Sequence, residues 1–72
     1  MPRRATRDIM EMVADGYTNL EIANEFQVSE KSISVDMVGI YRMFDIERVA
    51  NSCMRARAVS VAYQRGILKV KP

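Results

Sequence analysis

Residues 16–44 read GYTNLEIANEFQVSEKSISVDMVGIYRMF and contain the signals that decide the fold. Thr18 is followed three residues later by Glu21, which is the spacing of a capping box at a helix N-terminus. Ser29 is a second N-cap candidate, and the apolar residues that recur at helical spacing after it are Ile33, Met37, Ile40 and Phe44. These signals predict two helices joined by a tight turn at residues 27–28.

A further helix is expected before this stretch. Ile9, Met12 and Val13 recur at i, i+3 and i+4, so they predict the buried side of an amphipathic helix. Thr6 is a candidate N-cap for this helix. Gly16 is placed to end it, because glycine readily adopts the left-handed conformation that follows a helix C-terminus.

A long last helix is expected from Glu47 to Arg65, ended by Gly66. One apolar line along it consists of Ala50, Cys53, Met54, Ala58, Val61 and Ala62. A second line, on another side of the same helix, consists of Ala56, Val59 and Tyr63. In so small a protein, a helix that is apolar on two sides usually has its second side covered by another protein surface. This line therefore predicts self-association or a partner. Residues 67–72 are expected to form a tail, either packed through Ile67 and Leu68 or frayed.

The chain is short, and its charge is distributed unevenly. Its 72 residues correspond to one domain near the lower size limit for a core without covalent or metal staples. Residues 8–47 contain all nine acidic residues and two basic ones, a formal charge of −7. The remaining residues contain nine basic side chains and no acidic one. Residues 1–6 are interpreted as a basic N-terminal arm, which either contacts phosphate or is merely solvated.

Composition excludes several classes of protein. A single cysteine, Cys53, and the absence of histidine exclude a disulfide framework and a zinc site, so we expect a buried free thiol and no cofactor. No catalytic constellation can be assembled from these residues, so the protein is not expected to be an enzyme. No apolar run approaches the roughly 20 residues of a membrane span, which predicts a cytoplasmic protein without membrane contact.

The chain resembles the LuxR-type (GerE-like) helix-turn-helix of bacterial transcription regulators. Residues 12–23 read MVADGYTNLEIA where the family pattern reads LVAEGLSNKEIA, and residues 28–33 read VSEKSI where it reads ISEKTV. Residues 58–68, AVSVAYQRGIL, are similar to the last helix of the family and its Gly-Leu-Leu ending. The resemblance implies an all-α, four-helix DNA-binding module, here with a long C-terminal helix.

The sequence departs from the family pattern where that family touches DNA. Ser34 stands in place of a lysine that reaches the groove, and Asp36 stands in place of a histidine. The Leu-Thr-x-Arg-Glu opening of the family is replaced by PRRAT at residues 2–6. Several extra residues also lie between Ile46 and Arg55.

The resemblance implies a DNA-binding surface, and the second apolar line of the last helix suggests a dimer. The residues expected to face the major groove are Lys31, Ser34, Val35 and Val38, with the valines placed to contact thymine methyl groups. The residues expected to contact phosphate are Arg3, Arg4, Arg7, Thr18, Asn19, Ser32 and Arg42. A homodimer through the last helix, at Ala56, Val59 and Tyr63, would place two recognition helices about one DNA turn apart, ~34 Å.

Two functions follow from these observations. The first is a stand-alone transcription regulator, a single helix-turn-helix domain over residues 1–72 that binds double-stranded DNA as a homodimer. The acidic middle of the chain opposes this function, because Glu30 and Asp36 would lie near the DNA phosphates. The alternative is a protein-interaction module that keeps the helix-turn-helix fold but binds and modulates another transcription regulator.

Overall fold

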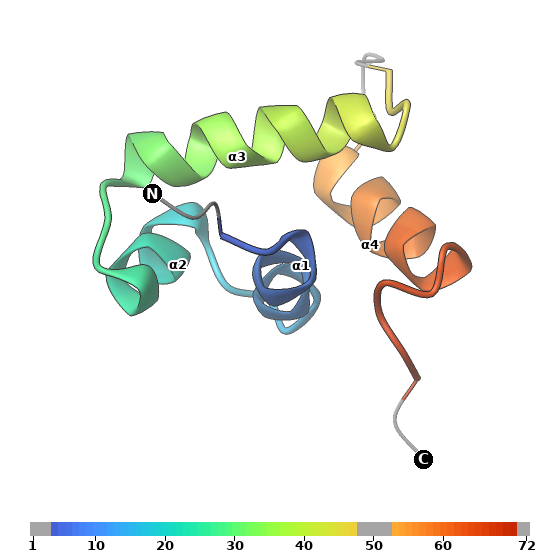
Figure 1. Cartoon of the computed structure of the whole chain (residues 1–72), viewed down its shortest axis with the longest axis horizontal. Coiled ribbons are helices and arrows are strands. Elements are labelled where there is room, and N and C mark those ends of the chain that lie inside the picture. Colours follow the sequence, from blue (N-terminus) through green and yellow to red (C-terminus); the bar gives the residue numbers. More distant parts are fainter. Residues whose placement is uncertain (1–3, 48–52, 71–72) are drawn as a thin grey trace.

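Four α-helices make up the part of the chain that the computed structural model describes, residues 4–47 and 53–70 (Figure 1). Their bounds are α1 (Thr6–Ala14), α2 (Asn19–Phe26), α3 (Glu30–Met43) and α4 (Met54–Gln64). In Figure 1, α3 runs across the top of the molecule, and the other three helices lie beneath it. The described residues contain no strand, and the all-α, four-helix fold class is confirmed.

Both N-caps in the central stretch form as their sequence signals predict. The Thr18 hydroxyl accepts a hydrogen bond from the Glu21 backbone N–H at 3.1 Å, and the Glu21 carboxylate accepts one from the Thr18 N–H at 2.9 Å. The Ser29 hydroxyl accepts the backbone N–H of Ser32 at 3.1 Å. These bonds satisfy backbone donors that a helix start leaves without intrahelical partners. They therefore define where α2 and α3 begin.

The turn between α2 and α3 is made by Gln27. This residue has φ +57°, in the left-handed region, and ends α2. The backbone N–H of Val28 then donates to the carbonyl of Ala23 at 3.0 Å, and the Val28 side chain packs against the core. The predicted helix-turn-helix is confirmed, with α2 packed on α3.

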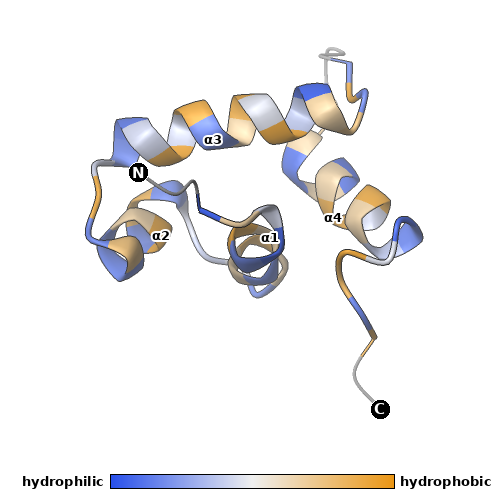
Figure 2. Ribbon diagram, in the orientation of Figure 1, coloured by the Kyte–Doolittle hydropathy of each residue, from blue (hydrophilic) through white to orange (hydrophobic). Residues whose placement is uncertain are grey.

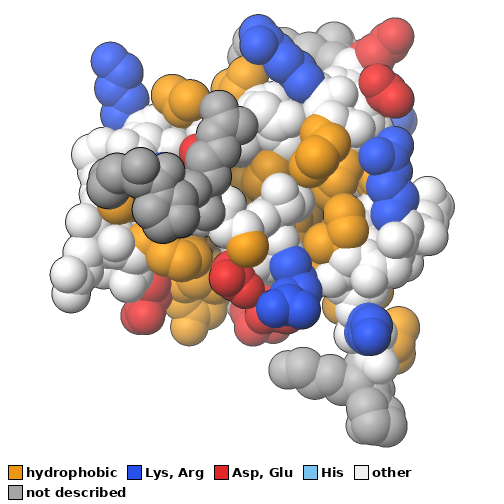
Figure 3. Space-filling model, viewed as in Figure 1, with side chains coloured by type: hydrophobic (Ala, Val, Ile, Leu, Met, Phe, Trp, Pro, Cys, Tyr) orange, Lys and Arg blue, Asp and Glu red, His pale blue; other side chains and the backbone are white. Residues whose placement is uncertain are grey.

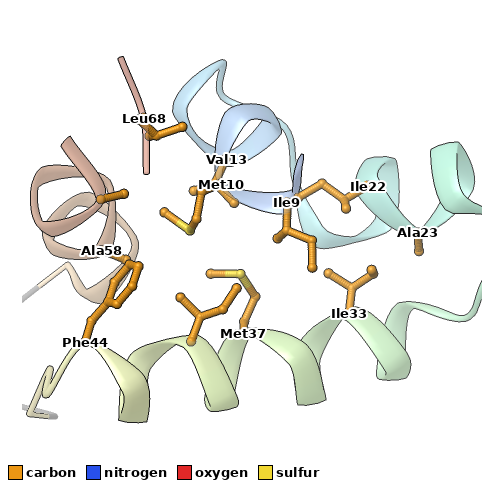
Figure 4. Close-up of a cluster of buried hydrophobic side chains, with 12 residues drawn as sticks. Ile9, Met10, Val13, Ile22, Ala23, Ile33, Met37, Phe44, Ala58 and Leu68 are labelled. Carbon is orange, nitrogen blue, oxygen red and sulfur yellow. The ribbon is translucent and has the colours of Figure 1, made fainter. Parts of the chain in front are cut away.

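The core draws on all four helices and on the segment after α4 (Figure 4). Its buried members are Ile9, Met10, Val13, Ile22, Ala23, Ile33, Met37, Ile40, Phe44, Ala58, Ala62 and Leu68. Full burial of each large apolar side chain contributes about 1.5–3 kcal/mol. The helices are therefore held mainly by this shared cluster, because helices this short are marginal alone.

One expectation for α1 is wrong, and another is borne out only in part. Thr6 is its first residue and not its N-cap; the cap position is Ala5, which makes no side-chain capping bond. Met10 is fully buried, whereas Met12, which we predicted for the core, is only partly buried. The buried side of α1 is wider than a single stripe because α4 packs on α1 as well.

The last helix begins later than predicted. Glu47 is not helical, and α4 starts at Met54 after the extended residue Cys53. The backbone of Asp45, at φ +56°, and that of Cys53, at φ −89° and ψ 99°, is not helical, so the described helix begins only at Met54. With 11 residues, α4 is shorter than α3, and Cys53 is exposed instead of buried. Ala50 lies outside the described residues.

The end of α4 is attached to α3 and to the core. Arg65 donates to the backbone carbonyl of Met43 at 3.1 Å, and its guanidinium lies 5.3 Å from the centre of the Phe44 ring. Gly66, at φ +77°, reverses the chain, and Leu68 then fills the core next to α1. The tail therefore packs through Leu68, which decides between the two possibilities left open by the sequence.

Candidate nucleic-acid interface

The outer side of α3 is hydrophobic in its middle. Ile33, Met37 and Ile40 point into the core, so Val35 and Val38 are turned to solvent with exposed fractions of 62% and 47%. Figure 2 shows hydrophobic residues alternating with hydrophilic ones along α3, with a hydrophilic start to the helix. The predicted groove residues Lys31 and Ser34 are exposed as well, and so is the predicted phosphate ligand Arg42.

Arg4 lies beside this outer surface. Its Nε donates to Oδ2 of Asp36 at 2.6 Å, and the two side chains are 22% and 24% exposed. The bond joins the segment before α1 to the middle of α3. Arg4 and Asp36 both depart from the LuxR-type pattern. They lie 32 residues apart, so no spacing in the sequence indicates that they form an ion pair. The carboxylate that we expected to oppose DNA binding is therefore neutralised by a neighbouring cation.

A hollow of about 450 Å³ lies next to this ion pair, between α3 and the start of α1. Its lining includes Arg4, Val35, Asp36, Val38, Arg42 and Met43. Figure 3 shows hydrophobic side chains exposed across the middle of one face of the molecule, with both basic and acidic side chains near its edges. Within the hollow, the apolar strip of Val35 and Val38 lies beside the cations Arg4 and Arg42, an arrangement that suits contact with base edges by the valines and with phosphates by the arginines.

Asn19 connects α2 to α3 and α4. Its carbonyl oxygen accepts a hydrogen bond from Arg55 at 2.5 Å, and its amide nitrogen lies 3.5 Å from the hydroxyl oxygen of Ser34. Arg55 also donates to the backbone carbonyl of Tyr17 at 2.6 Å. Burial raises the pKa of the nearby Tyr41 phenol above its ordinary value of 10.0, and the charge of Arg55 opposes that rise. Our sequence reasoning missed Arg55, since no local pattern marks a contact 36 residues away.

Two of the predicted phosphate ligands are already engaged within the protein. The Thr18 backbone N–H donates to the Glu21 carboxylate. This hydrogen bond is the main reason that the pKa of Glu21 lies below its ordinary value of 4.5, and hydrogen bonding with the Thr18 side chain is the second reason. Glu21 is therefore ionised at neutral pH next to the start of α2. Ser32 is partly buried, and its hydroxyl lies 3.0 Å from that of Ser29.

Residues 4–54 match the family model described as bacterial regulatory proteins of the luxR family. The chain belongs to this family. The match covers α1, α2 and α3 and ends at the first residue of α4. No curated protein and no solved structure gave a significant match. The LuxR-family assignment shows that the helix-turn-helix is a DNA-binding domain of the kind found in transcription regulators.

The other predicted residues of this LuxR-family domain are placed apart from the outer side of α3. Nε of Arg7 lies 4.0 Å from Oε1 of Glu11. Arg7 also lines a second hollow, of about 570 Å³, together with Tyr63. Tyr63 and Ala56 are exposed on α4, and Val59 is partly buried. The remaining predicted contact, Arg3, lies outside the described residues.

None of the helices that the structure describes in this LuxR-family chain is both long and apolar enough to cross a membrane.

Proposed function

We propose that this domain binds double-stranded DNA by inserting α3 into the major groove. The observation that supports the proposal best is the solvent exposure of Val35 and Val38 at the centre of α3, opposite its buried side. A β-branched methyl pair is suited to contact thymine methyl groups, and Ser34 beside it can bond a base edge. Lys31, one turn before Val35, would reach bases near the start of the helix.

Phosphate contacts are proposed for the cations and polar groups around this strip. Arg4 and Arg42 line the hollow beside the valines, and Asn19 lies at the start of α2 within reach of Ser34. Ser32 is a further proposed contact, and Arg3 is kept from the sequence prediction. Arg7 is left out, because it lines the other hollow with Tyr63.

We also propose that the domain acts as a homodimer through α4. Ala56 and Tyr63 are exposed on this line and Val59 is partly buried; the small Ala56 lets two helices approach closely, and the aromatic ring can supply most of the buried area. A two-fold axis at this contact would present two copies of α3 to half-sites about one DNA turn apart, ~34 Å.

The test is a fluorescence anisotropy titration of labelled mixed-sequence duplex DNA at about 50 and about 200 mM salt. Three arginine–phosphate contacts in each domain, from Arg3, Arg4 and Arg42, predict that affinity falls by about 40-fold over this range. Val35→Glu should abolish binding with an unchanged circular dichroism spectrum. The matched control is Val70→Glu, which adds the same charge at the most exposed of the large hydrophobic residues, and it should bind nearly as the wild type does. Full affinity in Val35→Glu would remove α3 from the interface.

A second candidate function is binding to another transcription regulator. It is favoured by the acidic residues of the chain, which are confined to residues 8–47, and by the exposed hydrophobic side chains of α3. An apolar strip in acidic surroundings also suits a protein surface with basic borders. Absence of DNA binding at the lower salt concentration would favour this function, and the strip on α3 would then be the place to seek the partner.

A further inference from the structure

We propose that Asp36 is a positioning residue for DNA binding: it holds Arg4 beside the outer side of α3, so that this acidic residue strengthens the affinity for DNA. The inference rests on the proposed function, because it assigns a role within the same surface. The expected effect of Asp36 on DNA affinity is the opposite of the usual one, because an acidic residue close to phosphates ordinarily weakens binding.

The geometry of the pair supports this role. The 2.6 Å contact joins Nε of Arg4 to a single carboxylate oxygen of Asp36. A guanidinium has five N–H donors, so the two terminal nitrogens remain available after this bond forms. Among the described residues, no hydrogen bond from these terminal nitrogens to a protein acceptor occurs. Arg4 can therefore stay bound to Asp36 and still donate to a phosphate oxygen.

The location of the pair explains why Arg4 needs a partner. Arg4 precedes the first residue of α1, so its backbone lies outside the helix, and the hydrogen bond to Asp36 attaches its side chain to α3. An arginine that is free to rotate loses conformational entropy when it binds a phosphate, and an arginine already held in place loses less. Both side chains are less than one quarter exposed, so solvent and salt screen the pair less than they screen a surface pair.

The pair also lies at the right place. Arg4 and Asp36 line the same hollow as Val35 and Val38, the side chains proposed to face the bases. A cation held at the border of that strip would meet the phosphates next to the bases that α3 reads. Without Asp36, the same cation would spread over many positions and would lose more conformational entropy on binding a phosphate.

The experiment is a double-mutant cycle read by DNA binding. The proteins are the wild type, Arg4→Gln, Asp36→Asn and the double variant, each titrated into the same labelled duplex at about 50 and about 200 mM salt. In the wild-type background, Asp36→Asn should weaken binding by about three- to tenfold and make the salt slope shallower by about 0.9, the value of one phosphate contact. In the Arg4→Gln background, the same change should strengthen binding, because only the repulsion is then removed.

Two further variants separate positioning from general charge effects. Glu30→Gln neutralises another acidic residue of α3, one without an ion pair among the described residues, and it should bind DNA as tightly as the wild type or more tightly. Asp36→Glu keeps the charge and should recover most of the affinity. If Asp36→Asn alters the circular dichroism spectrum, Asp36→Ser replaces it in the cycle.

The possible failures differ from one another. If the wild type binds and Asp36→Asn binds equally or more tightly, the positioning role is refuted while the proposed function stands. If Asp36→Asn has the same effect in both backgrounds, the residue does not act through Arg4, and the inference is refuted. If no protein in the set binds DNA at either salt concentration, the proposed function fails, and the inference fails with it.

Discussion

Replacing Arg55 by methionine should destabilise the domain, although the residue lies in no helix-turn-helix element. Arg55 bonds the side chain of Asn19 at 2.5 Å and the carbonyl of Tyr17 at 2.6 Å, and so joins the first turn of α4 to the start of α2. Methionine keeps the length and the helix propensity of arginine but has no N–H donor.

The size of the effect follows from these two bonds. A hydrogen bond from a charged donor contributes about 1.5–3 kcal/mol when buried, and less when it is partly exposed, as both are here. We expect a loss of about 1–2 kcal/mol in the free energy of unfolding for the pair. In a domain of this size, 1 kcal/mol corresponds to about 4–8 °C in Tm, so the midpoint should fall by roughly 5–15 °C.

The assay is thermal and urea unfolding followed by circular dichroism at 222 nm, a wavelength that reports the helices directly. The matched control is Arg57→Met, the same change two residues along α4 at an exposed arginine. It should shift Tm by less than about 3 °C, as surface substitutions usually do. Equal midpoints for Arg55→Met and Arg57→Met would refute the reasoning and would mean that Arg55 does not hold α2 to α4.

Three further predictions concern the core, the cap and the dimer. Met10→Ala should cost about 3 kcal/mol and Met12→Ala about 1 kcal/mol or less, measured by urea unfolding, because Met10 alone is fully buried; equal costs would contradict this. Glu21→Gln should destabilise the domain at about pH 7 but not at about pH 3: the folded pKa of Glu21 is lowered, so its contribution is present above the ordinary value of 4.5 and lost as the pH falls through the folded value. Urea unfolding at both pH values checks this, and a gap that persists in acid would exclude the carboxylate as its source. Tyr63→Asp should make the protein monomeric in light scattering, and an unchanged dimer mass would exclude this line of α4 as the contact.

Local signals in the sequence predicted the helix-turn-helix closely. The Thr18 and Ser29 caps form as their spacing indicated, and the apolar stripe of α3 faces the core. By contrast, the start of α4 was predicted too early. α4 starts without a side-chain capping bond at Cys53, so no local signal in the sequence marks its first residue.

The candidate site was predictable only in part. The exposure of Val35 and Val38 follows from the helical period, because the opposite positions are apolar and buried. That Arg4 would pair with Asp36, and that Arg7 would lie beside Tyr63 instead, did not follow from any spacing. The sequence suggested that Arg3, Arg4 and Arg7 contact phosphate in the same way. In the fold, Arg4 lies beside α3 and Arg7 lines the other hollow.

By itself, the sequence determined the helices from Thr6 to Phe44, the turn at Gln27, the family and the outward side of α3. These features depend on interactions within about four residues along the chain, which a linear pattern records. Only the tertiary structure decided that Met10 is buried, that Arg55 holds Asn19, and that Arg4 compensates Asp36. The two hydrogen bonds span 36 and 32 residues, so they exist only once helix packing has brought distant segments together.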